Sequence, residues 1–270
     1  MSRRFRRALF GLAAVSINIF AGQSAIAAEP AEAEPIRVIL VGDSTMAART
    51  GYGDALCKRF RPNVSCINVA KGGRSSGSFR AEGLWDQVME RLRTSGQYRA
   101  TYVLIQFGHN DQPGKPGRST DLVSEFPVNI ARYVDETKSL GATPVLVTPL
   151  IRRIFRDGVL KNDLEPWAES IRRVATVKRV PLLDLNAQSA AAVTAMGSAE
   201  ADTLAEEPEA RTAITLPAKV TDNAKTGPNA TAKSRFDYTH LGEKGATLFA
   251  QMVAQHLVLT LPTIAPHIKP

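Results

Sequence analysis

The fold of this chain can be inferred from the segment Ile36-Arg37-Val38-Ile39-Leu40-Val41-Gly42-Asp43-Ser44. Its apolar run Ile36–Val41 is rich in branched side chains, which is typical of a strand buried on both faces. Four further apolar runs follow, at Cys66–Val69, Tyr102–Phe107, Pro144–Thr148 and Val180–Asp184. A segment long enough for a helix separates each run from the next, and this alternation predicts a parallel sheet.

The segments between the runs show the periodicity of helices. Within Glu125–Leu140 the apolar residues fall on one helix face, and Gly141 follows as a stop signal. Similar patterns predict helices at Leu84–Leu92, Leu164–Val177 and Glu243–Leu257. Strands covered by helices on both faces form a three-layer α/β domain, here with a five-stranded parallel sheet. The stretch Asn186–Arg235 fits this pattern less well and predicts a helix followed by a long loop.

The N-terminus has the pattern of an export signal. Four arginines within the first seven residues precede the apolar stretch Ala8–Ala21 and the small residues Ala25-Ile26-Ala27. This order predicts a signal peptide at residues 1–28 and one domain over residues 29–270. Because the apolar stretch is shorter than the ~20 residues of a membrane-spanning helix, no stable membrane anchor is expected. The protein is therefore expected in the periplasm or outside the cell, with Sec and twin-arginine export both open.

Charge and cysteine content narrow the possible partners. Without the signal peptide the formal charge falls from +8 to 30 − 26 = +4, so no nucleic-acid partner is indicated. The two cysteines, Cys57 and Cys66, are too few for a disulfide-dense fold. Thiols outside the cytoplasm tend to pair, so we expect a structural Cys57–Cys66 disulfide between a helix and the next strand. The sequence does not indicate an oligomeric state.

Four polar blocks stand at the predicted ends of elements. They are Gly42-Asp43-Ser44, Gly72-Gly73-Arg74-Ser75, Gly108-His109-Asn110-Asp111 and, before the last helix, Asp237-Tyr238-Thr239-His240. In an open parallel sheet the carboxyl ends of the strands share one edge, and ligands bind beyond that edge. We therefore expect the blocks to lie together at one site.

Together the blocks supply every group that a serine hydrolase needs. Ser44 is the candidate nucleophile, His240 its base, and Asp237 the acid that orients the imidazole. The backbone N–H groups of Ser44 and Gly73 and the side-chain amide of Asn110 are candidates for the oxyanion hole. Each motif alone also fits a helix cap, a turn or a surface pair. Their joint order at the strand ends favours the catalytic interpretation.

Other candidate groups are weaker. His109 lies beside Asn110 without an acid three residues earlier, so it is expected to have a structural role or to contact substrate. The sequence has no cysteine pair or histidine cluster at metal-ligand spacing, so neither a catalytic metal nor another cofactor is expected.

The four blocks resemble those of the GDSL, or SGNH, hydrolase superfamily. Thr45 replaces the leucine of the namesake motif, a variant that resembles the rhamnogalacturonan acetylesterase branch. So do the flanking stretches Asn68-Val69-Ala70, Ile105-Gln106-Phe107 and Pro144-Val145-Leu146-Val147-Thr148-Pro149. The resemblance implies a flavodoxin-like sheet, the roles given above for Ser44, Asp237, His240 and Asn110, and removal of acetyl groups from pectin galacturonate through an acetyl-serine intermediate. Gly72 remains an alternative to Gly73 in the oxyanion hole.

An acidic polysaccharide would need cationic contacts. Arg152 and Arg153 follow the fourth strand, and together with Arg74 they are candidates to bind a uronate carboxylate in bidentate geometry. The alternative is that these arginines pair with Asp157, Asp163 or other carboxylates of the chain. The expected partner is thus an acetylated acidic polysaccharide or oligosaccharide. A lipase or thioesterase of the same fold, and a glycan-binding protein without activity, are the competing hypotheses.

Overall fold

The computed structural model describes residues 34–94, 96–206 and 237–270. The predicted signal peptide, residues 1–28, and residues 207–235 of the predicted loop lie outside these ranges. The chain from Ala33 to Pro270 forms one compact unit. No helix within the described ranges has the length and apolar character required to cross a membrane.

Five parallel strands form the central sheet, as predicted. They are β1 (Ile36–Gly42), β2 (Val64–Asn68), β3 (Ala100–Gln106), β4 (Thr143–Val147) and β7 (Leu182–Leu183). Their spatial order is β2-β1-β3-β4-β7, so the strand that begins the domain lies inside the sheet. Every neighbouring pair is parallel. The loops that follow the strands therefore leave from one edge.

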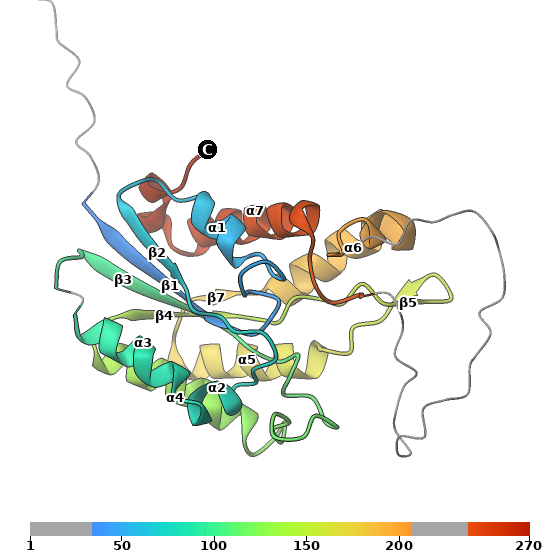
Figure 1. The fold of residues 1–270 in the computed structure, drawn as a ribbon, viewed down its shortest axis with the longest axis horizontal. Coiled ribbons are helices and arrows are strands. Elements are labelled where there is room, and N and C mark those ends of the chain that lie inside the picture. Colours follow the sequence, from blue (N-terminus) through green and yellow to red (C-terminus); the bar gives the residue numbers. More distant parts are fainter. Residues whose placement is uncertain (1–33, 95, 207–236) are drawn as a thin grey trace, which may run out of the picture. The chain divides into compact units, whose positions relative to one another are not determined.

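Helices cover both faces of this sheet (Figure 1). One face carries α1 (Gly53–Lys58), α6 (Leu185–Asp202), α7 (Glu243–Thr260) and the 3₁₀ helix η1 (Pro262–His267). The other carries α2 (Ser78–Ala81), α3 (Leu84–Arg93), α4 (Phe126–Ser139) and α5 (Glu165–Lys178). Alternate residues of β1 point into the two cores: Leu40 packs with Phe249 of α7, and Ile39 packs in the cluster that holds Trp85 of α3.

Three details differ from or refine the predicted elements. A short hairpin, β5 (Phe155–Arg156) and β6 (Val159–Leu160), follows β4 where no strand was predicted. The predicted strand Val180–Asp184 is reduced to the two residues of β7. The predicted helix after Asn186 is present as α6, which is interrupted at Gly197 by a left-handed φ of 71°.

Two local links tie the chain together near α1 and α7. Cys57 of α1 and Cys66 of β2 form a disulfide with a Cα–Cα distance of 5.4 Å, as expected from the sequence. Ala205 and Leu241 form an isolated antiparallel bridge, and the Gly242 N–H donates to the Leu204 carbonyl at 3.0 Å. This bridge joins the end of α6 to the start of α7 on the two sides of residues 207–236.

Candidate active site

The loops after β1, β2 and β3 meet at the carboxyl edge of the sheet. The Lys71 N–H donates to the Gly42 carbonyl at 2.9 Å, which joins the first two loops. The Asn110 amide donates to the Arg74 carbonyl at 3.1 Å, which joins the second and third. A Cβ atom placed on Gly72 would lie 3.7 Å from the Cβ of Ser44. The sequence blocks around Ser44, Gly73 and Asn110 are therefore neighbours.

Thr50 connects the Ser44 loop to the segment that carries His240. Its hydroxyl donates to the Ser44 carbonyl at 2.8 Å, and its own carbonyl accepts the Leu241 N–H at 3.0 Å. One residue thus fixes the backbone of the serine relative to the backbone next to the histidine. Ser44 and His240 lie near opposite ends of the domain in sequence, and Thr50 holds their loops together.

Asp237 and His240 form a tight pair on one turn. The imidazole Nδ1 lies 2.6 Å from Asp237 Oδ2, and Asp237 Oδ1 accepts the N–H groups of Thr239 and His240. Burial alone would raise the pKa of Asp237, but the bonds from His240 and Thr239 hold it below its usual value. An ionised carboxylate on Nδ1 leaves Nε2 as the atom that can take up a proton.

Ser44 itself is 8% exposed at the start of the turn after β1. Among the described residues its hydroxyl makes no hydrogen bond to His240. Contacts of this kind often tighten only when substrate is bound.

Arg153 supports the Asp237–His240 turn from beneath. Its backbone N–H donates to the Tyr238 carbonyl at 2.9 Å, and its Nη2 donates to the carbonyls of Asp237 and His240 at 2.9 and 2.8 Å. The side chain is 0% exposed. Burial lowers the pKa of Arg153 to about 10, so the guanidinium remains protonated at neutral pH. A single buried cation therefore fixes both ends of the turn, while its own backbone holds the middle.

The arrangement around Gly73 can stabilise an oxyanion. Arg74 Nη1 donates to the Gly72 carbonyl at 2.8 Å. In the trans peptide between Gly72 and Gly73, the carbonyl and the N–H point in opposite directions. The bond from Arg74 therefore also orients the Gly73 N–H. Gly73 has a left-handed φ of 77°. Within the described residues no backbone acceptor binds the N–H groups of Ser44 or Gly73. Asn110 uses one amide hydrogen on Arg74 and keeps the second for a ligand.

A buried polar network lies under the serine loop. The Tyr52 hydroxyl donates to Gln106 Oε1 at 2.7 Å, Gln106 Nε2 donates to Thr45 Oγ1 at 2.7 Å, and Thr45 Oγ1 donates to Asp43 Oδ1 at 2.8 Å. Asp43 Oδ2 lies 3.2 Å from His109 Nδ1. Thr45, which replaces the family's leucine, thus links β3 to the loop of the candidate nucleophile.

Of the two predicted roles of His109, the structure favours the structural one. The side chain is 2% exposed and faces Asp43. Burial lowers the pKa of His109 below its usual value, which leaves the imidazole neutral at neutral pH. A neutral ring can donate from Nδ1 to the Asp43 carboxylate. His109 therefore orders the serine loop from below.

The arginines predicted to bind substrate have partners within the protein. Arg153 is buried in the contacts described above, so its predicted role in substrate binding is wrong. Arg152 pairs with Asp163 and donates to Gln112 Oε1 at 2.8 Å, which is the alternative that the sequence left open. Arg74 pairs with Glu82 at 2.8 Å while it fixes the Gly72 carbonyl. None of the three is available as a free cation.

Asp111, next to Asn110, is a buried acid with a structural role. Its Oδ1 accepts the Ser76 N–H at 3.0 Å, the Ser76 hydroxyl at 2.6 Å and the Thr120 hydroxyl at 2.9 Å. Burial raises the pKa of Asp111 to about 6 despite these bonds. The carboxyl group joins the loops after β2 and β3.

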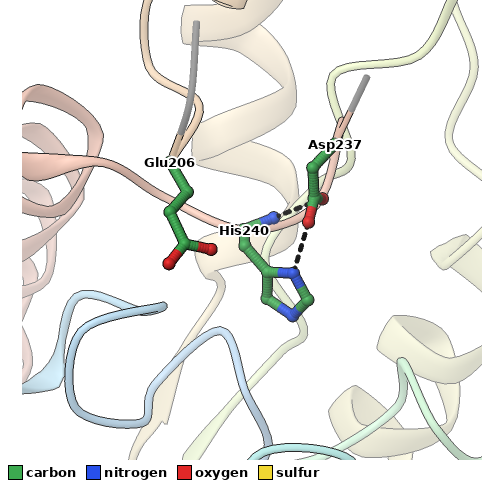
Figure 2. Close-up of side chains that lie close together, drawn as sticks. All are labelled: Glu206, Asp237 and His240. Carbon is green, nitrogen blue, oxygen red and sulfur yellow. Dashed lines mark hydrogen bonds and ion pairs between the residues drawn. The ribbon is translucent and has the colours of Figure 1, made fainter. Parts of the chain in front are cut away.

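Glu206 is a site residue that sequence analysis did not single out. Figure 2 shows its carboxylate beside His240, on the side of the imidazole away from Asp237. Ligand atoms of Glu206, Asp237 and His240 all lie within 4.8 Å of one another. Such a set could hold a cation, but Nδ1 of His240 is already engaged by Asp237. No motif in the sequence pointed to Glu206, because its place beside His240 depends on how the chain after α6 folds back.

Comparisons with known proteins place the chain in a family. The GDSL-like lipase/acylhydrolase family model matches residues 40–248. The chain is 33% identical over 230 residues to the rhamnogalacturonan acetylesterase RhgT of Bacillus subtilis, covering 82% of this chain and 89% of RhgT. It is 28% identical to the probable rhamnogalacturonan acetylesterase YesY of the same species, covering 86% of this chain and 97% of YesY.

A solved structure shows the same fold at lower identity. It is a variant of Axe2, an acetyl-xylooligosaccharide esterase from Geobacillus stearothermophilus, with 15% identity and a TM-score of 0.56. The match covers 84% of this chain and 95% of that one. From the family match over most of its length, together with the blocks at the carboxyl edge of the sheet, the chain belongs to the GDSL-like lipase/acylhydrolase family of carboxylic ester hydrolases.

Proposed function

We propose that the protein is an exported serine acetylesterase that removes acetyl groups from acetylated plant polysaccharide, with rhamnogalacturonan as its substrate. Two relatives support this substrate class, since RhgT and YesY both carry the name rhamnogalacturonan acetylesterase and align over most of their length. The pectic backbone contains galacturonate, so the polymer is acidic. The acidic polysaccharide expected as binding partner is then also the substrate of the enzyme.

Acylation begins at the Ser44 hydroxyl. Its Oγ attacks the carbonyl carbon of the acetyl ester while Nε2 of His240 takes the hydroxyl proton, and the imidazolium is stabilised by Asp237. The carbonyl oxygen becomes an oxyanion, which accepts hydrogen bonds from the Ser44 and Gly73 N–H groups and from Asn110. When the tetrahedral intermediate collapses, the bond to the sugar oxygen breaks and His240 returns the proton to that oxygen. The acetyl group remains on Ser44.

Deacylation repeats these steps with water. A water molecule gives a proton to His240 and attacks the acetyl-serine carbonyl, and the same donors hold the second oxyanion. Collapse breaks the bond to Ser44, and His240 protonates the serine oxygen. Acetate leaves and the free hydroxyl is restored, with no net change in the enzyme.

The observation that carries this proposal is the Asp237–His240 pair. Its Nδ1–Oδ2 distance is 2.6 Å, and Thr50 ties its turn to the Ser44 carbonyl. A carboxylate on Nδ1 selects the tautomer that accepts a proton at Nε2. Arg153 fixes that turn, so the pair is preorganised before substrate arrives.

The proposal is tested by acetate release from acetylated rhamnogalacturonan, acetylated xylan and p-nitrophenyl acetate. We expect kcat/KM to be higher on acetylated rhamnogalacturonan than on acetylated xylan. Ser44→Ala should lower kcat by at least about 1,000-fold on every ester, because it removes the nucleophile. Ser139→Ala, at an exposed position near the end of α4, serves as the matched control. Faster turnover of xylan, or activity retained in Ser44→Ala, would contradict the proposal.

Export is the second part of the proposal. It rests on the arginine-led apolar stretch and the Ala25-Ile26-Ala27 site at the N-terminus. Expressed with its full N-terminus in a Gram-negative host, the protein should accumulate in the periplasm or medium with a new N-terminus close to Ala28. Recovery of the uncleaved chain from the cytoplasm alone would contradict export.

A further inference from the structure

Arg118 stands at the rim of the candidate oxyanion hole. Its Nη1 lies 3.4 Å from the position that a Cβ atom on Gly73 would occupy. The residue is exposed and belongs to the loop between β3 and α4. An exposed guanidinium this close to Gly73 is within reach of a sugar whose acetyl group is bound at Ser44.

The loop that carries Arg118 is held in place by its own hydrogen bonds. The N–H groups of Arg118 and Ser119 donate to the Lys115 carbonyl at 3.0 and 2.9 Å. The Ser119 hydroxyl accepts the Lys115 N–H and donates to the Gln112 carbonyl, both at 2.8 Å. The backbone at Arg118 is therefore ordered before any ligand binds, which lowers the entropy lost on binding.

Arg118 differs from its cationic neighbours in having no partner. Arg74 pairs with Glu82, and Arg152 pairs with Asp163. Across the described residues, by contrast, the Arg118 side chain makes no hydrogen bond or ion pair. No carboxylate of the described residues therefore pairs with the charge of Arg118.

Lys115 adds a second positive charge beside Arg118. Its ammonium donates to the His109 carbonyl. Burial is the main cause that lowers the pKa of Lys115, to about 8, and the charges of Arg152 and Arg118 lower it further. The group is still mostly protonated at neutral pH, so repulsion between the two cations persists in the free enzyme. A bound carboxylate would relieve that repulsion.

A groove adjoins Arg118. It has a volume of about 390 Å³ and lies between α2 and the start of α4. Hydroxyl and amide side chains line it with Arg118, at Ser119, Thr120, Ser124 and Asn129. Its acid, Glu125, accepts the Asp121 N–H at 2.7 Å. Such a lining suits the hydroxyl groups of a sugar chain extending past the reacting residue.

We propose that Arg118 is the specificity residue of this esterase and binds a uronate carboxylate of the substrate, with Lys115 adding to the positive potential. A guanidinium offers two parallel N–H donors that match the two oxygens of a carboxylate. The inference rests on the proposed function, since it concerns the acidic polymer that Ser44 deacetylates. In this proposal Arg118 binds the uronate carboxylate, in place of Arg74, Arg152 and Arg153, which the sequence analysis had suggested.

The test compares Arg118→Ala and Arg118→Lys with wild type on acetylated rhamnogalacturonan oligosaccharide, acetylated xylo-oligosaccharide and p-nitrophenyl acetate. For Arg118→Ala we expect KM on the acidic oligomer to rise at least about tenfold more than KM on either neutral ester. Arg118→Lys keeps the charge without the bidentate geometry, so its KM on the acidic oligomer should lie between those of wild type and Arg118→Ala. Added salt should raise the wild-type KM on the acidic oligomer, and this dependence should be weaker in Arg118→Ala.

Arg99→Ala is the matched control, because Arg99 is an exposed arginine that precedes β3 at the amino edge of the sheet. It should change none of the three KM values. Equal increases on acidic and neutral substrates in Arg118→Ala would overturn the specificity role while leaving the proposed function in place. Absence of wild-type activity on acetylated pectic substrate, with activity on the neutral esters, would overturn the proposed function and this inference with it.

Discussion

The guanidinium of Arg153 donates a 2.8 Å hydrogen bond to the carbonyl oxygen of His240. The same Nη2 donates to the Asp237 carbonyl, so one side chain holds both ends of the turn that carries the acid and the base. Since the side chain is fully buried, water cannot replace these bonds. Arg153 thus holds the backbone of the turn, and Asp237 holds the imidazole at Nδ1.

Arg153→Lys should impair catalysis more than substrate binding. A lysine keeps the charge, but it is shorter and lacks the second terminal nitrogen, Nη1, which donates to the Thr239 carbonyl at 3.5 Å. The turn should therefore lose part of its support, and the imidazole its fixed orientation. We expect kcat on p-nitrophenyl acetate to fall by about 10- to 100-fold with a much smaller change in KM. Arg156→Lys in the neighbouring hairpin is the control. A wild-type kcat in Arg153→Lys, measured on folded protein, would show that the turn does not need this support.

Thr45→Val should destabilise the fold. Valine keeps the shape of threonine but removes the hydroxyl that accepts from Gln106 and donates to Asp43. Both of those groups are buried and would lose a partner, at a cost of about 1–3 kcal/mol in the free energy of unfolding. Urea denaturation measures the change. The exposed Thr176→Val should stay within about 0.5 kcal/mol of wild type, and a similar value for Thr45→Val would contradict the role of the network.

Asp111 should make stability depend on pH in an unusual direction. Its pKa in the folded protein, about 6, lies above the ordinary aspartate value of 3.8 that applies to the unfolded chain, so folding favours the protonated form. This contribution is complete below the unfolded pKa and is lost as pH rises through the folded pKa. The loss amounts to about 3 kcal/mol at most.

Asp111→Asn tests that dependence. Asparagine can accept the same bonds at Oδ1 and has no charge to bury, so it should not suffer the loss. The difference in unfolding free energy between Asp111→Asn and wild type should therefore grow in favour of the variant from about pH 4 to about pH 7. Urea denaturation across this range gives the difference, and a difference that does not change with pH would contradict the prediction.

The disulfide should stabilise the oxidised protein. Cys57 and Cys66 are separated by 9 positions, and closing a loop of that size is worth about 2–3 kcal/mol in the chain-entropy estimate. Replacing both by serine should lower the free energy of unfolding by this amount. Reductant should lower wild-type stability to a similar level and leave the double variant unchanged. A wild type that is insensitive to reductant would indicate that the bond does not contribute.

Local patterns in the sequence were sufficient to predict the sheet and most helices. The apolar run from Ile36 to Val41 needs burial on both faces wherever it lies, and helix-length segments separate it from the next runs, so this local pattern predicted β1 and its parallel neighbours. The hairpin of β5 and β6 did not, because each of its strands has two residues and no periodicity can be read over so short a length. The bounds of short elements were also hard to predict: the predicted strand Val180–Asp184 is only Leu182–Leu183 in β7.

The four blocks predicted which loops meet, but not how their side chains pair. Arg153 follows β4 just as Arg152 does, yet one is enclosed under the catalytic turn and the other faces Asp163. Nothing in the spacing distinguishes them, because the difference arises from packing against residues 84 positions later. Arg118 had no signal at all, since its place beside Gly73 depends on how a long loop folds back.

The bridge between Ala205 and Leu241 has a wider consequence. It brings together the two described ends of the chain on either side of residues 207–236, and ligand atoms of Glu206 and Asp237 lie within 4.8 Å of each other. Changing the length of a segment whose ends are already joined costs only a logarithmic increment of closure entropy. The acid and base can therefore stay in place while this stretch is exchanged, trimmed or extended, which makes it a natural position for grafting a carbohydrate-binding module onto the enzyme.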